Sequence, residues 1–363
     1  MEELLNTSVG TFIHISEAEW ATTSSITHTS RSRSGIPFYH RIVVALCLCL
    51  VTAVGFLGNS LVFTSVAFCK KLHTATNVLI VNLAIADFLT CVCLPFLVIG
   101  LVNRSGEYPL PDVVCIVTTG LLFSCSGAAI QTLAAISILR WYVITKGVRG
   151  RRGFNEPKKA IACSIFTWAT SIIYVVVPVL FGVGKLGYSR FYSLCSVTDS
   201  NPLVHYFVLI QGSVIILTLI VTAVFYARIL VFVVNHGRSF RSKFPVVDRE
   251  IRSGTGGCGA TKGHFNFNAA LQEREVKITK NLFTIVCVFV VCFLPSGVNF
   301  AIPGASVLTL YGSMMMMANS ALNPIIYGLK HPNFRDVFGK IIHCRLSDIP
   351  EPSRRLCFRF MKP

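Results

Sequence analysis

The sequence predicts an all-α membrane protein, a bundle of seven transmembrane helices with its N-terminus outside and a short amphipathic eighth helix. Three observations carry this prediction. The chain is 53% hydrophobic and only 13% charged, against about 25% charged residues in soluble domains. Its mean hydropathy is +0.65. Long stretches, such as residues 42–69, 113–139 and 160–184, contain no Lys, Arg, Asp or Glu.

The longest charge-free stretch, residues 281–329, covers 49 residues. As a single helix it would measure roughly 73 Å at about 1.5 Å per residue, far more than the roughly 30 Å hydrocarbon core of a bilayer. We therefore predict two helices with a turn near Ile302-Pro303-Gly304. The seven spans are predicted at residues 40–68, 76–101, 113–142, 159–182, 203–234, 276–301 and 306–328.

The basic residues orient the bundle. With the N-terminus outside, 27 of the 33 Lys and Arg residues fall in cytoplasmic segments or at cytoplasmic helix ends, as the positive-inside rule requires. This placement explains the net charge of +17 without a nucleic-acid partner, because the lipid bilayer attracts basic segments too. The chain divides into an extracellular tail (1–39), the transmembrane domain (40–329) and a cytoplasmic end (330–363) of a plasma-membrane protein. The acceptor sequences for N-glycosylation at Asn6 and Asn103 both fall on the outside.

The cytoplasmic segments contain one long loop and one amphipathic stretch. Residues 235–272 include a Gly- and Ser-rich middle with the composition of a flexible linker. Residues 333–342 alternate basic and apolar side chains at helical spacing, which suits a helix on the inner leaflet. Cys344 and Cys357 follow this helix and are candidates for palmitoylation, with plain cytosolic thiols as the alternative.

Two of the fourteen cysteines stand apart. Cys115 begins the third span on the outside, and Cys195 lies in the loop between the fourth and fifth spans. Most of the others fall in spans or on the cytoplasmic side, where disulfides are disfavoured. We predict an extracellular Cys115–Cys195 disulfide, with free thiols as the alternative.

Polar residues inside the spans mark the functional sites, because they are costly in hydrocarbon. Asp87 lies in the middle of the second span, and Asn59, Asn319 and Asn323 are its plausible partners. Arg140 follows Cys115 by 25 residues, about 38 Å of helix, which places it at the inner surface. Prolines at positions 95, 178, 295 and 324 interrupt four spans and free backbone carbonyls there.

These residues resemble the signatures of rhodopsin-like G-protein-coupled receptors. The matching motifs occur in order on the expected spans: Gly58-Asn59, Asn82-Leu83-Ala84-x-x-Asp87, Trp168, Cys292-Phe293-Leu294-Pro295 and Asn323-Pro324-Ile325-Ile326-Tyr327. The resemblance covers roughly residues 40–342. Within the family, Ile326-Tyr327-Gly328-Leu329, Arg190-Phe191-Tyr192-Ser193 and a fifth helix without proline are most similar to melatonin-receptor-like proteins and related invertebrate orphan receptors.

The resemblance implies a mechanism and partners. An extracellular small molecule enters among the helices, and the cytoplasmic ends open to receive a heterotrimeric G protein, with arrestin as a further partner. The residues implied in coupling or activation are Arg140, Tyr226, Glu275, Phe293, Pro295, Asn323, Pro324 and Tyr327. Glu275 is expected to pair with Arg140 in the inactive state, or else to be solvated. Asp87, Asn319 and Asn323 resemble the family's sodium pocket, although Ala129 stands where a serine is often found; no other cofactor is expected.

Several residues depart from the family pattern. Leu139 replaces the acid that usually precedes the arginine, and Trp141 replaces the usual tyrosine. Leu122 stands where amine receptors carry an aspartate, and Met317 where opsins carry the retinal-binding lysine. These departures argue against an amine or covalently bound retinal, and the missing asparagine beside Pro178 argues against melatonin itself.

What remains is an apolar pocket with a few hydrogen-bonding groups, typical of a small-molecule site. Its predicted lining is Leu122, Phe123, Ser126, Gln211, Phe293, Ser296, Asn299 and Met317. Lys185, at the predicted mouth, would suit a lipid-like or acidic ligand; the alternative is a solvated loop lysine.

Three other functions are weighed against a signalling receptor. A transporter or channel would show internal repeats or several intramembrane charges, and Asp87 is the only acid deep in a span. An enzyme would need a metal-ligand cluster, nucleophile motif or phosphate loop, which the sequence lacks. A non-signalling or decoy receptor remains open because of Leu139, and it would be insensitive to substitution of Arg140.

Overall fold

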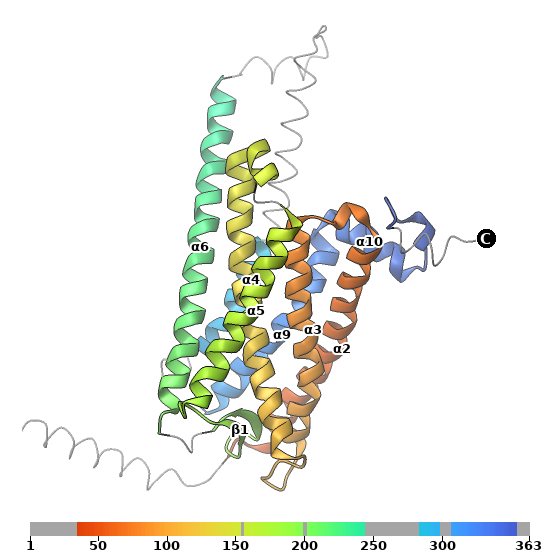
Figure 1. Cartoon of the computed structure of the whole chain (residues 1–363). Coiled ribbons are helices and arrows are strands. Elements are labelled where there is room, and N and C mark those ends of the chain that lie inside the picture. The colour runs from red at the N-terminus through yellow and green to blue at the C-terminus, as the bar shows by residue number, and fades with distance from the viewer. Residues whose placement is uncertain (1–34, 154–155, 199–201, 244–282, 298–305, 354–363) are drawn as a thin grey trace, which may run out of the picture.

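A computed structural model of the chain describes residues 35–153, 156–198, 202–243, 283–297 and 306–353. It is a bundle of long helices running side by side (Figure 1). The bundle helices are α2 (Phe38–Phe68), α3 (Ala75–Val102), α4 (Asp112–Gly153), α5 (Pro157–Leu180), α6 (Val204–Lys243), the helix Phe283–Gly297 and α9 (Ser306–Lys330). By length and composition, α2 to α6 can each cross a membrane.

The predicted spans are helical where the structure describes them, with two main differences at cytoplasmic ends. Of the sixth span (276–301) only residues 283–297 are described, and the turn predicted near residues 302–304 lies outside the described residues. α4 continues to Gly153 and α6 to Lys243, whereas we predicted ends at 142 and 234. The first nine residues of the predicted 235–272 loop are therefore helical. The extensions carry basic side chains that water solvates readily, so hydropathy marks where the apolar span ends and not where the helix ends. Residues 244–272 lie outside the described residues.

Local signals set several helix starts. Thr74 caps α3, its side chain accepting a hydrogen bond from the Asn77 backbone N–H (3.3 Å). Pro157 and Pro332 occupy the first turns of α5 and α10 (Pro332–Ile342), where the missing N–H costs nothing.

α10 confirms the predicted eighth helix. Phe334, Val337 and Phe338 on its inner face are buried, and Phe334 stacks on Tyr327 of α9 with ring centroids 5.7 Å apart. The other face exposes Arg335 and Asp336. This arrangement holds α10 against the end of α9.

A short segment beyond α10 returns to the loop between α2 and α3. After a 3-10 turn, η2 (Leu346–Asp348), the chain bonds back to that loop: Lys70 N–H donates to the Glu351 carbonyl (2.9 Å) and Ser353 N–H to the Phe68 carbonyl (2.8 Å). The same loop contains η1 (Lys70–Leu72) and the buried Cys69. We name residues 346–353 the tail strap.

At the opposite end of the bundle lies a hairpin (Figure 1). Strand β1 (Leu186–Ser189) pairs antiparallel with β2 (Leu194–Val197), with Tyr188 opposite Cys195. The sequence analysis assigned no structure to this segment. The core divides accordingly, one apolar cluster lying towards α10 and a second beneath the hairpin.

Candidate functional site

The disulfide predicted between Cys115 and Cys195 is present. It joins the first turns of α4 to β2, with the two Cα atoms 5.3 Å apart. Because β1 and β2 are bonded along their length, the disulfide fixes the whole hairpin over the end of the bundle. The hairpin thereby covers the space between α4 and α9.

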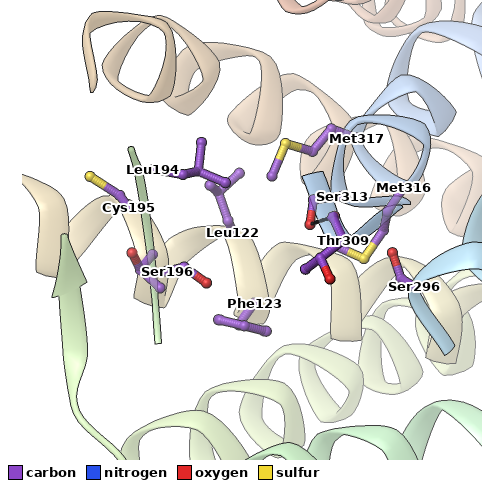
Figure 2. A pocket seen from close by; sticks show the side chains of 11 residues that line it. Leu122, Phe123, Leu194, Cys195, Ser196, Ser296, Thr309, Ser313, Met316 and Met317 are labelled. Carbon is purple, nitrogen blue, oxygen red and sulfur yellow. Dashed lines mark hydrogen bonds between the residues drawn. The ribbon is translucent and has the colours of Figure 1, made fainter. Parts of the chain in front are cut away.

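Beneath the hairpin is a pocket (Figure 2). α4, β2, the helix Phe283–Gly297 and α9 all contribute side chains, so the pocket lies where four elements meet. Its lining residues are Thr119, Leu122, Phe123, Leu194, Cys195, Ser196, Ser296, Thr309, Ser313, Met316 and Met317. None of these is an acid or a base, and four hydroxyl groups of α4, α9 and the helix Phe283–Gly297 are the polar groups that it offers below the hairpin.

Four of the eight predicted lining residues do line this pocket: Leu122, Phe123, Ser296 and Met317. Three do not. The Gln211 side chain donates to the Tyr174 carbonyl (3.2 Å) and so faces α5. Phe293 stacks on Phe289 with centroids 3.9 Å apart, inside the core.

Ser126 lies one turn below Phe123 on α4 and is not among the lining residues. Asn299 lies outside the described residues. Residues that the sequence analysis missed include Thr309, Ser313 and Met316, which share a helical face with Met317 and were open to prediction from that spacing. Leu194 and Ser196 flank Cys195, so the predicted disulfide also pointed to them.

Deeper in the bundle, Asp87 is buried and accepts a hydrogen bond from Asn323 Nδ2 (2.7 Å). This confirms one of the partners proposed for it. Asn59 instead donates to the carbonyls of Gly55 (2.8 Å) and Ser320 (3.0 Å). The Asp87 carboxylate is thus held from α9 while Asn59 ties α2 to the same turn of α9.

The side-chain types near Asp87 are those that a small hard cation prefers as ligands, and sodium binding there stays a prediction. The side-chain carbonyl oxygens of Asn59, Asn319 and Asn323 are buried and accept no hydrogen bond from the described residues. Such oxygens, with a carboxylate, are the ligands that hard cations prefer. Orphaned buried acceptors are costly, so a cation here would satisfy them.

At the cytoplasmic end, Arg140, Tyr226 and Tyr327 are all buried. Arg140 is close enough to Tyr226 to interact electrostatically, and Tyr226 to Tyr327. The Tyr226 ring also packs on Phe283, with centroids 5.5 Å apart. The structure therefore brings together three residues that we predicted for coupling, from α4, α6 and α9.

Leu139 and Trp141, the two residues beside Arg140 that depart from the family pattern, both have packing partners in the bundle. Leu139 is buried in the apolar core, where the acid common in the family would be desolvated. Trp141 packs on Phe225 (5.4 Å between centroids) and lies under the Arg228 guanidinium (5.9 Å), which joins α4 to α6. Glu275 lies outside the described residues, so its pairing with Arg140 stays a prediction.

Comparison with known families decides the class. The family described as "7 transmembrane receptor (rhodopsin family)" matches residues 58–327. The chain belongs to the rhodopsin family of seven-transmembrane receptors. It is accordingly a multi-pass membrane receptor of the G-protein-coupled class and not an enzyme.

Individual relatives are distant. Somatostatin receptor type 5 of Bos taurus is 26% identical over 90% of this chain and 85% of its own length. Melanopsin-B of Xenopus laevis is 28% identical over 84% of this chain and 55% of its own. Squid rhodopsin superposes with a TM-score of 0.71 at 20% identity, covering 90% of this chain and 92% of that one, which supports the fold alone. These relatives do not test the expected closeness to melatonin receptors.

The remaining sites of the receptor stay predictions. Asn103 is half-buried and its side chain donates to Ser105 Oγ (2.7 Å), and Cys344 is exposed directly after α10. Asn6 and Cys357 lie outside the described residues. Lys185 is exposed and does not line the pocket, as expected of a solvated loop lysine.

Proposed function

We propose that this receptor passes the binding of an extracellular, non-aminergic small molecule to a heterotrimeric G protein at the plasma membrane. The observation that carries the proposal is the continuity of α4 between the two sites. α4 lines the pocket with Thr119, Leu122 and Phe123 and carries Arg140 in its cytoplasmic half. Eighteen residues separate Leu122 from Arg140, about 27 Å of helix.

The helix Phe283–Gly297 supplies a second link between the sites. Ser296 lines the pocket near one end of this helix, and Phe283 packs on Tyr226 at the other. A ligand that contacts Ser296 more favourably in one position of the helix shifts the population towards that position. Phe283 then moves relative to Tyr226 and Arg140, where the G protein would bind.

The pocket chemistry supports the ligand class. With Leu122 and Met317 in its lining and no carboxylate there, an ammonium group would be desolvated without a partner, which is unfavourable. Apolar walls with a few hydroxyl groups suit a largely apolar molecule that makes few hydrogen bonds. Arrestin at the cytoplasmic end and sodium at Asp87, Asn319 and Asn323 belong to the same proposal.

The test is G-protein dissociation in living cells, wild type against Arg140→Ala at matched surface expression. Basal activity that the variant loses, by tenfold or more, supports coupling through Arg140. Equal activity in both proteins contradicts it. Silence of both would favour the decoy reading, and Leu139→Asp would then show whether restoring the acid restores a signal.

A further inference from the structure

An arginine is buried at the extracellular end of α2. Arg41 continues the inward face that Val44, Ala45 and Leu48 form, and only 9% of its surface is exposed. Almost any other residue type is cheaper at such a position, because a buried cation loses its hydration. Its surroundings therefore need an explanation.

The partners of Arg41 do not neutralise it. Nη1 donates to Ser193 Oγ in the turn of the hairpin, and the guanidinium lies 5.0 Å from the centroid of the Phe38 ring. Nε is buried and finds no acceptor among the residues that the structure describes. No carboxylate of the described residues forms an ion pair with Arg41, so within this part of the chain its charge is met by a hydroxyl and a ring.

A second cation contacts the same ring. The exposed Arg104 places its guanidinium 4.2 Å from the same Phe38 ring. Two like charges on one ring repel each other, and an anion bound close to both would offset that repulsion. Arg190, by contrast, is already paired with Glu107 (3.2 Å), so the neighbouring acid is engaged elsewhere.

The arginine pair adjoins the pocket. Ser193, which holds Arg41, adopts a left-handed conformation (φ 52°), and the next residue, Leu194, lines the pocket. Val44 and Leu48 of α2 belong to the same apolar cluster as Leu122, Leu194 and Met317. The arginines and the pocket lining thus border the same packed apolar core, and the Ser193–Leu194 step of the hairpin is their direct connection.

We propose that Arg41, assisted by Arg104, binds an anionic oxygen group of the ligand, a carboxylate, phosphate or sulfate. The inference rests on the proposed function, because the remainder of the ligand would occupy the pocket below the hairpin. The planar guanidinium suits such groups, since it presents paired donors to two oxygens. The acidic ligand first connected with Lys185 is thereby assigned to a different, buried cation.

The probe is monododecyl phosphate, with dodecanol and inorganic phosphate as separate arms. Thermal unfolding of the purified full-length receptor in phosphatidylcholine nanodiscs reports binding, and no G protein is present. We expect dodecyl phosphate to stabilise the wild type, and Arg41→Gln to weaken its apparent affinity at least tenfold. Lys185→Gln, which removes an exposed cation of the same face, should leave the affinity unchanged.

If Arg41→Gln does not fold, Arg104→Gln replaces it in the test, because Arg104 is exposed and its substitution should not disturb folding. We expect Arg104→Gln to weaken the binding of dodecyl phosphate at least threefold. Stabilisation by inorganic phosphate that depends on these arginines also supports the site and identifies a free anion as sufficient. The proposal is overturned if neither phosphate stabilises the wild type, if dodecanol equals dodecyl phosphate, or if both arginine variants bind as the wild type does. No G protein takes part in this binding measurement. A failed Arg140 test of coupling therefore does not affect the binding result, and a failed binding test does not affect the result on coupling.

Discussion

At the scale of single residues, the sites are built from polar side chains that the bundle buries. Asp87 depends on Asn323, and Arg140 is buried beside Tyr226. Each such group is kept in hydrocarbon only where a partner or a function offsets its desolvation. This is why Asp87 and Arg140 could be selected from sequence, whereas Arg41 could not: its burial depends on the hairpin turn at Ser193, which no local pattern predicts.

Sodium should stabilise the wild-type receptor through Asp87. Replacing potassium chloride by sodium chloride at constant ionic strength should raise the Tm of the purified receptor, because sodium would satisfy the orphaned amide oxygens of Asn59, Asn319 and Asn323. In Asp87→Asn this sodium-dependent rise should disappear. A wild type whose Tm is the same in both salts would exclude the cation site.

Gly58 should tolerate no side chain. A Cβ there would lie 2.6 Å from Cγ of Pro324, whereas a Cβ at Gly212 would meet nothing within 4 Å. Gly58→Ala should therefore destabilise the receptor by about 1–3 kcal/mol, the usual range for overpacking. Gly212→Ala is the matched control and should change stability little; equal Tm values for the two variants would contradict the close packing of α2 on α9.

At the scale of elements, hydropathy located the helices well and the short elements poorly. The seven spans and α10 follow from apolar length and helical spacing, which are local properties. The hairpin and the tail strap each contain only a few residues and are held by contacts far along the chain, such as Cys115–Cys195 and Ser353 with Phe68. The same reason explains the pocket: its helical residues were partly predicted, whereas of its hairpin residues only Cys195 was named, as a disulfide partner.

The tail strap should shield Cys69. Its thiol is 1% exposed and donates to the Pro350 carbonyl (3.1 Å). Truncation after Arg345 removes this cover, so maleimide should label Cys69 at least tenfold faster when the cytoplasmic side is accessible. Mass spectrometry distinguishes Cys69 from the exposed Cys344, which serves as the internal control; an unchanged rate for Cys69 would show that the strap does not cover it.

At the scale of the whole molecule, two helices connect the pocket under the hairpin with the buried Arg140 towards the other end of the bundle. α4 and the helix Phe283–Gly297 both reach from one site to the other. Helices transmit displacement because their packed interfaces favour a few discrete arrangements. We therefore expect a change in the pocket to be transmitted through these helices and to alter the surroundings of Arg140.

The most direct test is a double-mutant cycle on basal G-protein dissociation in cells. Ser296→Trp fills the pocket from the helix Phe283–Gly297, and Leu294→Trp, on the exposed side of the same helix, is the matched control. We predict that Ser296→Trp changes basal activity at least twofold, that Leu294→Trp does not, and that Arg140→Ala abolishes the change. An effect of Ser296→Trp that persists undiminished with Arg140→Ala, or no effect in an active receptor, would contradict coupling between the two ends.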